Sequence, residues 1–184
     1  MNMDSRIELT TARLLLKPIT PAVIHNLFNT KTKEEIIYFF NVDEAGYDHL
    51  KNMHEKGMET FRISQLFFLI HEKETNQVIG ECGYHTWNPS HNRAELFYGM
   101  RNDTFKQKGY MKEALNEVID YGFNVMKLHR IQALIADSNT PSKKLLLHYG
   151  FVKEGTIRED YVVDGKNEDS DQYSLLKQEW KKRS

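Results

Sequence analysis

The sequence reads Phe105-Lys106-Gln107-Lys108-Gly109-Tyr110-Met111-Lys112-Glu113-Ala114-Leu115 where an apolar, strand-like run passes into an amphipathic helical pattern. A short basic loop with a glycine at a helix N-terminus presents backbone N–H groups to a phosphate. One glycine beside two lysines also occurs on many solvated loops, so the loop alone does not establish an anion site. The flanking sequence has to support that interpretation.

The flanking residues predict strands on either side of a helix. Residues 94–100 and 130–136 have the composition of strands, and 111–126 carries a helical apolar stripe. Asn139-Thr140-Pro141-Ser142 begins a further helix, which Gly150 ends. Other helices are expected at 21–28, 33–40 and 47–61, and other strands at 12–17, 66–70, 78–85, 151–157 and 171–176. This order predicts one α/β domain over residues 1–184, with a mixed sheet and no linker.

Composition narrows the function. The chain has 184 residues, 40% hydrophobic and 28% charged, with a net charge of −1. A near-neutral chain has no overall field for nucleic acid or an anionic membrane. The single cysteine, Cys82, lies in a strand-like run and is interpreted as a buried structural thiol. Neither a membrane-length apolar run nor a secretion signal is present, so a cytoplasmic location is expected.

Four segments in order resemble the GCN5-related N-acetyltransferase (GNAT) superfamily, and within it the RimJ/RimL-like branch. They span nearly the whole chain: Thr10–Leu16; Ala94–Tyr98 with the loop and Lys112–Leu115; Leu128–Ile131 with Asn139–Ser142 and Gly150-Phe151; and Asp164-Gly165 through Tyr173–Leu176 to Glu179-Trp180. The resemblance implies acetyl-coenzyme A (acetyl-CoA) as donor and a primary amine as acceptor, joined by direct attack in a ternary complex. It also implies a mostly antiparallel sheet that splays between two parallel strands, the one ending at Met100 and the one at 131–136.

The resemblance also assigns residues to the cofactor. Pantetheine would bind the exposed strand edge at Tyr98, Gly99 and Met100, and Asn139 would contact it. Lys144 stands where relatives often have arginine and would reach the nucleotide phosphates. The pyrophosphate would rest on the N–H groups of the loop residues Lys106, Gln107, Lys108, Gly109, Tyr110 and Met111. This loop departs from the family pattern, and Met111 in place of a small residue would either crowd the cofactor or point into the core.

Two residues are candidates for proton transfer. Glu95 lies mid-strand, where a carboxylate is costly unless it faces a wet cleft, and it is the candidate base. The alternative for Glu95 is an ion pair with Arg93 or Arg101, or an outward, solvated position. The tyrosine acid of many relatives is absent, since Leu146 occupies its place. Ser142 is the remaining candidate acid, although capping of the first helical turn is the favoured interpretation; Tyr149 is expected to pack.

The histidine spacings match no metal site, and no metal is expected. The predicted function is therefore acetyl-CoA-dependent N-acetylation, and the alternative is a non-catalytic acyl-CoA-binding sensor on the same fold. The acceptor stays open among a protein N-terminus, an amino acid, a polyamine and a drug-like amine. Residues 21–61 and the Asp164-Gly165 hairpin are expected to line its side. The hairpin carries an acidic set that either attracts a cationic amine or is simply solvated: Glu159, Asp160, Asp164, Glu168, Asp169 and Asp171. No direct nucleic-acid or membrane partner is expected, and the protein is expected to be a monomer or homodimer.

Overall fold

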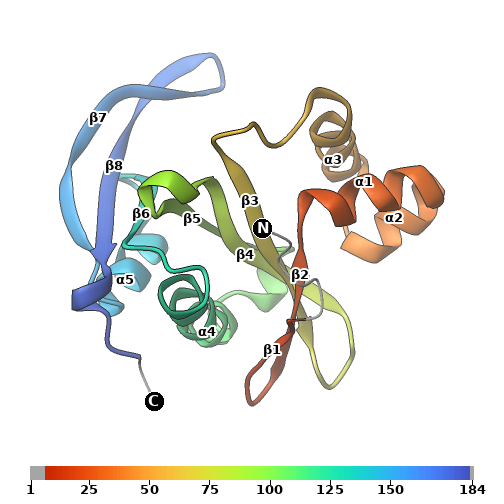
Figure 1. The fold of residues 1–184 in the computed structure, drawn as a ribbon, viewed down its shortest axis with the longest axis horizontal. Coiled ribbons are helices and arrows are strands. Elements are labelled where there is room, and N and C mark those ends of the chain that lie inside the picture. Colours follow the sequence, from red (N-terminus) through yellow and green to blue (C-terminus); the bar gives the residue numbers. More distant parts are fainter. Residues whose placement is uncertain (1–6, 183–184) are drawn as a thin grey trace.

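The computed structural model describes residues 7–182 and forms one α/β domain around an eight-stranded sheet (Figure 1). The strands follow the order β1-β2-β3-β4-β5-β6-β8-β7, and all neighbours are antiparallel except β5 and β6. This is the predicted mixed sheet. Its elements are β1 (Leu9–Thr10), β2 (Leu14–Ile19), α1 (Pro21–Thr30), α2 (Lys33–Phe40), α3 (Glu44–Lys56), β3 (Ser64–Glu72), β4 (Val78–Asn88), β5 (Arg93–Met100), α4 (Tyr110–Asn124), β6 (Arg130–Ala136), α5 (Thr140–His148), β7 (Val152–Val163) and β8 (Lys166–Leu176).

Two hydrophobic clusters lie on opposite faces of the sheet. The run Leu66–Ile70 of β3 is buried throughout, with Phe68 and Ile70 in one cluster and Phe67 and Leu69 in the other. Because side chains alternate along a strand, a continuous apolar run must be covered on both sides. Helices α1, α2 and α3 cover one face, and α4 packs on the other (Figure 1).

Helix α4 packs closely against Tyr84 of β4. Its predicted stripe is buried as expected, and the Tyr84 hydroxyl donates to the backbone oxygen of Val118 at 2.9 Å. A Cβ at Gly122 would lie 2.4 Å from that tyrosine oxygen, so glycine is required at this position. The close approach fixes the middle and C-terminal half of α4 against β4.

Three predicted boundaries are wrong for identifiable reasons. The helix expected at 47–61 runs instead from Glu44 to Lys56 as α3. It begins earlier because Asp43 caps it by accepting from the N–H of Gly46, and it ends earlier because Gly57 adopts φ +88°. The strand expected to stop before Pro18 continues to Ile19. Proline is tolerated there because β1 pairs only with Leu15 and Leu16, so β2 has a free edge beside Pro18.

The final hairpin is also longer than expected. Strands predicted at 151–157 and 171–176 extend to Val163 and back to Lys166, joined by Asp164 and Gly165 at φ +50° and +76°. Positive φ at both positions matches the two-residue turn that the Asp-Gly pair favours. Most of β7 is exposed, so it lacks the apolar alternation by which a strand is recognised. The distal half of this hairpin projects beyond β6 (Figure 1).

The parallel contact between β5 and β6 is short. Only Arg93–Glu95 pairs with Arg130–Gln132, and the rest of β5 pairs with β4 alone. The two strands therefore diverge after Glu95, as the resemblance implied.

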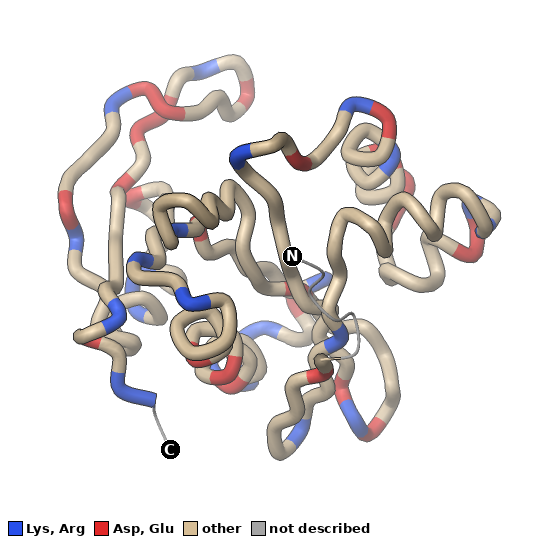
Figure 2. The backbone as a smooth tube through the Cα atoms, viewed as in Figure 1, with Lys and Arg blue, Asp and Glu red and all other residues tan. Residues whose placement is uncertain are grey.

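The charges along the chain are of mixed sign, with Lys and Arg interspersed among Asp and Glu (Figure 2). None of the helices within residues 7–182 has the length and hydropathy to cross a bilayer.

An ion pair ties the last two strands to β6. Arg130 donates to both carboxylate oxygens of Glu154, and the Ser174 hydroxyl donates to one of them at 2.7 Å. The Arg130 guanidinium lowers the pKa of Glu154 from its ordinary value of 4.5 to about 2. A lowered carboxyl pKa stabilises the fold above the unfolded-state value, and this stabilisation is lost as the pH falls through 4.5 towards 2.

We predict that Glu154→Gln lowers the melting temperature at pH 7 by about 2–4 °C, equivalent to about 1 kcal/mol for a partly exposed pair. The difference from the wild type should shrink as the pH falls below 4.5. Calorimetric melting between pH 3 and 8 measures it. Glu55→Gln, which breaks an exposed helical pair with Lys51, is the control and should change the melting temperature less. A difference that is constant with pH would contradict the assignment.

Candidate active site

A cleft of ≈ 420 Å³ opens where β5 and β6 diverge. Residues from β4, β5, β6, the start of α5 and the β7–β8 hairpin form its wall. The structure thereby gathers four of the predicted site residues in one place: Glu95, Tyr98, Asn139 and Ser142. Of the other lining residues, those that matter chemically are His85, Asp160, Tyr161 and Ser170.

Glu95 lies at the last paired position of the two parallel strands. Its backbone neighbours are His85 on β4 and Gln132 on β6. The Glu95 carboxylate accepts from Nε2 of Gln132 at 3.3 Å and lies 3.5 Å from Nε2 of His85. The side chain is only 16% exposed. The alternative of an ion pair with Arg101 is wrong, because Arg101 pairs with Glu81 at 2.8 Å and donates to the backbone oxygen of Phe40.

Ser142 of α5 and Tyr98 of β5 both line the cleft, and their hydroxyl groups lie near each other. The predicted capping role of Ser142 is wrong: Asn139 caps α5, and its side-chain oxygen accepts from the N–H of Ser142 at 3.2 Å. The Ser142 hydroxyl is thus not needed by the helix. Burial raises the pKa of the Tyr98 phenol, and the nearby Ser142 hydroxyl partly offsets this effect. The Tyr98 oxygen is buried without a well-formed hydrogen bond among the described residues.

The edge of β5 beyond Glu95 is free on the side of the cleft. Tyr98, Gly99 and Met100 pair with β4 on their other edge only. A Cβ at Gly99 would meet no atom within 4 Å, so there is open space beside this backbone. An unpaired strand edge next to open space can bind an extended ligand through its N–H and C=O groups.

The basic loop ends in left-handed backbone and then turns into α4. Gln107 and Gly109 have φ values of +60° and +79°. Gly109 is the N-cap of α4 and offers no side chain to the helix. Among residues 7–182, the N–H groups of Tyr110, Met111 and Lys112 have no hydrogen-bond partner. Free N–H groups at the positive end of a helix dipole form an anion site.

Side chains of the loop take different directions. Lys106 forms an ion pair with Asp103 at 2.6 Å, and Lys108 is exposed. The Met111 side chain packs against the main hydrophobic cluster, which is the second of the two predicted outcomes. Lys144 is exposed on α5. Gly99, Met100, Lys144 and the loop 106–111 lie outside the lining of the cleft at the strand divergence.

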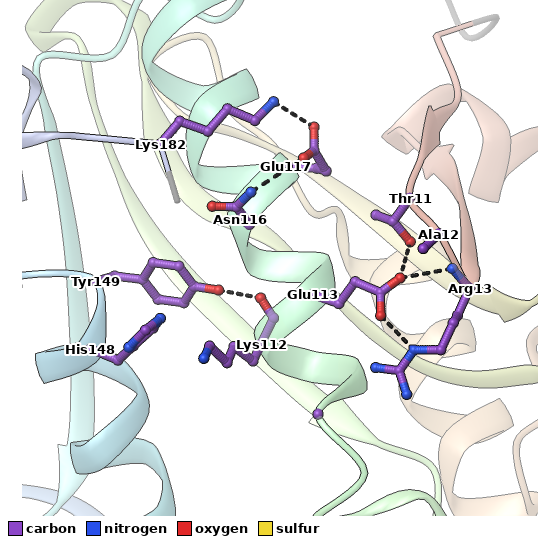
Figure 3. A pocket seen from close by; sticks show the side chains of 11 residues that line it. Thr11, Ala12, Arg13, Lys112, Glu113, Asn116, Glu117, His148, Tyr149 and Lys182 are labelled. Carbon is purple, nitrogen blue, oxygen red and sulfur yellow. Dashed lines mark hydrogen bonds and ion pairs between the residues drawn. The ribbon is translucent and has the colours of Figure 1, made fainter. Parts of the chain in front are cut away.

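Arg13 supports the loop, a role the sequence did not reveal. Its guanidinium donates to the backbone oxygen of Lys108 at 3.1 Å and to the Glu113 carboxylate at 2.7 Å. It also lies over the Tyr110 ring, 4.5 Å from the centroid. Figure 3 shows Thr11 and Arg13 around Glu113 in a second pocket, where Tyr149 donates to the backbone oxygen of Lys112. Tyr149 is therefore buried and packed, as predicted.

Other reactive side chains lie apart from these sites. Cys82 is completely buried, and burial raises the pKa of its thiol, in agreement with a structural role. His54 contacts His25 of α1 with 2.8 Å between their Nδ1 atoms. Across the described part of the chain, no three or more His, Cys, Asp or Glu side chains are grouped to hold a metal ion.

His85, Gln132 and Tyr161 are chemically important cleft residues that were not predicted from the sequence, whereas Asp160 belongs to the acidic set of the hairpin. One signal could have found His85. A hairpin closed symmetrically about the predicted turn at 88–92 pairs position 85 with position 95. Tyr161 had no such signal, because it lies on the part of β7 that was not recognised as a strand.

Comparison with known proteins identifies the family. The sequence profile of the acetyltransferase (GNAT) domain matches residues 13–152. An uncharacterised N-acetyltransferase of Bacillus licheniformis, p20, is 41% identical over 61% of this chain, which spans 63% of that relative's length.

Solved structures share the fold. The structure of spermidine N-acetyltransferase from Vibrio cholerae, in complex with CoA and spermine, aligns over 92% of this chain and 98% of that chain, with a TM-score of 0.67 and 23% identity. The structure of ribosomal-protein-S5-alanine acetyltransferase from Vibrio fischeri aligns over 95% of this chain and 99% of that chain, with a TM-score of 0.66 and 22% identity. With the profile match and the strand divergence, these findings show that the chain belongs to the GNAT family of acetyltransferases.

Proposed function

We propose that this protein transfers an acetyl group from acetyl-CoA to a primary amine, by direct attack while both are bound. The observation that carries the proposal is the position of Glu95, a largely buried carboxylate at the point where β5 and β6 diverge. A base at that point can reach an amine in the cleft, and the free β5 edge beside it can hold the donor.

The chain offers binding groups for both the pantetheine and the pyrophosphate of acetyl-CoA. Acetyl-CoA would supply an activated thioester. Tyr98, Gly99 and Met100 would bind pantetheine through the free strand edge, with Asn139 beside it. The unpartnered N–H groups at the start of α4 would hold the pyrophosphate, aided by Lys106, Gln107, Lys108 and Gly109. Lys144 would approach the nucleotide phosphates.

We predict that Arg13→Ala raises the dissociation constant of CoA about tenfold, or ~1.4 kcal/mol. The change removes the support of the Lys108 carbonyl and of the Tyr110 ring, so the loop N–H groups lose their preset orientation. Isothermal titration calorimetry measures the constant. Lys31→Ala, which breaks an exposed ion pair with Glu35, is the control and should bind CoA like the wild type. Unchanged binding by Arg13→Ala would refute the role of Arg13.

Glu95 is the proposed base. The ammonium group of the acceptor must lose a proton before its nitrogen attacks the thioester carbonyl. Glu95 accepts that proton directly or through one water, and Gln132 holds its second oxygen in place. The low exposure of the carboxylate favours transfer inside the cleft over exchange with bulk solvent.

We expect Glu95→Gln to lower kcat by about 100-fold or more while the affinity for acetyl-CoA stays nearly intact, because general base catalysis has this magnitude. Steady-state kinetics and calorimetry give the two quantities. Glu117→Gln makes the same carboxylate-to-amide change on α4, where the partner is Lys182, and should leave both unchanged. Full turnover by Glu95→Gln would remove Glu95 from the mechanism.

Ser142 is the proposed acid, which returns a proton to the leaving thiolate. Its hydroxyl is free of capping, lines the cleft and lies beside the buried Tyr98 phenol. A hydroxyl in this position can donate to sulfur at the moment the thioester bond breaks.

Replacement of Ser142 by Ala should reduce kcat by about tenfold or more, with little change in the KM for acetyl-CoA. The helix should be unaffected because Asn139 provides its cap, so the melting temperature serves as a structural readout. Thr140→Ala is the matched control, because Thr140 is exposed and lies two residues before Ser142 on α5. If both variants retain the wild-type kcat, Ser142 is not the acid.

The acceptor is proposed as a primary amine that enters beside the β7–β8 hairpin. Asp160 and Tyr161 reach the cleft from this hairpin, and Asp160 adds a carboxylate that attracts an ammonium ion. Relatives named for spermidine and for the alanine of ribosomal protein S5 make a polyamine or a protein N-terminus the first candidates. A monomer or homodimer is the proposed assembly.

A thiol-release assay over a panel of amines tests the function as a whole. Release of CoA that depends on one amine supports acetyl transfer. Binding of acetyl-CoA without turnover on any amine would favour the alternative of a non-catalytic acyl-CoA sensor. Two departures from the family pattern favour that alternative, Met111 in the loop and the absent tyrosine acid. The first is weaker as an argument, because Met111 packs against the core.

A further inference from the structure

We infer that His85 takes the proton from Glu95 and releases it to solvent at the mouth of the cleft. The inference rests on the proposed acetyl transfer and deepens it. His85 is a positioning and relay residue, since it acts through Glu95 rather than on the acceptor.

The two side chains form a cross-strand pair. His85 and Glu95 are register partners on β4 and β5, so they lie on the same face of the sheet. Nε2 of His85 is 3.5 Å from the Glu95 carboxylate. Acid–base pairs of this kind are often long in the free enzyme and tighten when substrate binds.

Exposure increases in the direction that a departing proton must travel. The Glu95 side chain is 16% exposed and that of His85 is 40% exposed. The other nitrogen of His85, Nδ1, lies 3.3 Å from the hydroxyl of the exposed Thr86. One imidazole nitrogen therefore faces the buried carboxylate and the other faces outward.

The backbone next to His85 is strained. Thr86 has φ +46°, in the left-handed region that a β-branched residue rarely adopts. The register between β4 and β5 shifts between His85 and Asn88, which marks a bulge at this point. Bulges re-aim side chains and occur frequently beside active sites. The Phe97 ring also packs against the His85 imidazole, with 5.5 Å between the ring centroids.

The proton count of the reaction requires such an exit. A primary ammonium that becomes an amide loses two protons, and the leaving thiolate takes up one. The surplus proton breaks its N–H bond and forms an O–H bond on Glu95. It then moves to Nε2 of neutral His85, whose Nδ1 proton passes to water beyond Thr86. Glu95 is again a carboxylate and His85 is neutral with its proton on Nε2. Proton exchange with solvent returns His85 to the tautomer that is protonated on Nδ1 before the next turnover.

Two other titratable groups share the cleft. Asp160 and Tyr161 line it from the hairpin, but neither forms a hydrogen bond or ion pair with Glu95. Among the described residues, the hydrogen-bond and ion-pair partners of the Glu95 carboxylate are His85 and Gln132, and the Gln132 amide cannot carry a proton away at neutral pH. His85 is therefore the group placed to receive it.

Buffer rescue tests the relay. In His85→Ala and His85→Gln, kcat should fall by about tenfold or more, while the KM for acetyl-CoA changes less than about twofold. Added imidazole should restore the rate of His85→Ala in proportion to its concentration and leave the wild type unaffected. His91→Ala, at an exposed turn outside the cleft, is the control and should behave as the wild type.

Two results would overturn the inference. Wild-type kcat in His85→Gln would reduce His85 to a hydrogen-bonding residue, and a rate of His85→Ala that ignores imidazole would exclude proton transfer. If the wild type acetylates no amine, the proposed function fails, and the pair is then tested by ¹⁵N NMR. Glu95→Gln should shift the imidazole signals of His85 while Glu117→Gln should not; an absence of any shift would refute the coupling.

Discussion

The short parallel pairing of β5 and β6 is the constraint on which the site depends. The two strands share backbone hydrogen bonds only up to Glu95 and Gln132. Beyond that point the backbone of β5 has one edge without a strand partner, and buried N–H and C=O groups need partners. An extended ligand or water must satisfy them. The divergence therefore creates a cleft in the centre of the sheet, where its walls are held by strands on both sides.

The same constraint explains the environment of Glu95. A carboxylate in the middle of a sheet has a high desolvation cost unless polar groups surround it. The last paired position provides them, because His85 and Gln132 stand on the two flanking strands at the same level. Register thus sets which groups meet the carboxylate, and a shift of β5 by one residue would turn Glu95 to the face opposite His85 and Gln132.

The loop before α4 depends on a contact from the other end of the chain. Burial acts to raise the pKa of Glu113, but hydrogen bonds from Thr11 and Arg13 outweigh it and leave the pKa lowered. Glu113 therefore stays ionised and holds Arg13, which in turn contacts Lys108 and Tyr110. The turn between β1 and β2 therefore supports the loop that we propose to hold the pyrophosphate, although none of its residues lies in that loop.

The sequence by itself determined what depends on local patterns. The apolar run at Leu66–Ile70, the stripe of α4, the Asp164-Gly165 turn and the basic loop before a helix are all local, and they indicated the fold and Glu95. Only the tertiary structure decided the contacts between distant segments. It placed His85 and Gln132 beside Glu95, Arg13 beside Lys108 and Asp160 in the cleft. Strand register and hairpin length set these contacts, because hydrogen bonding between strands joins residues that carry no mark of each other in the sequence.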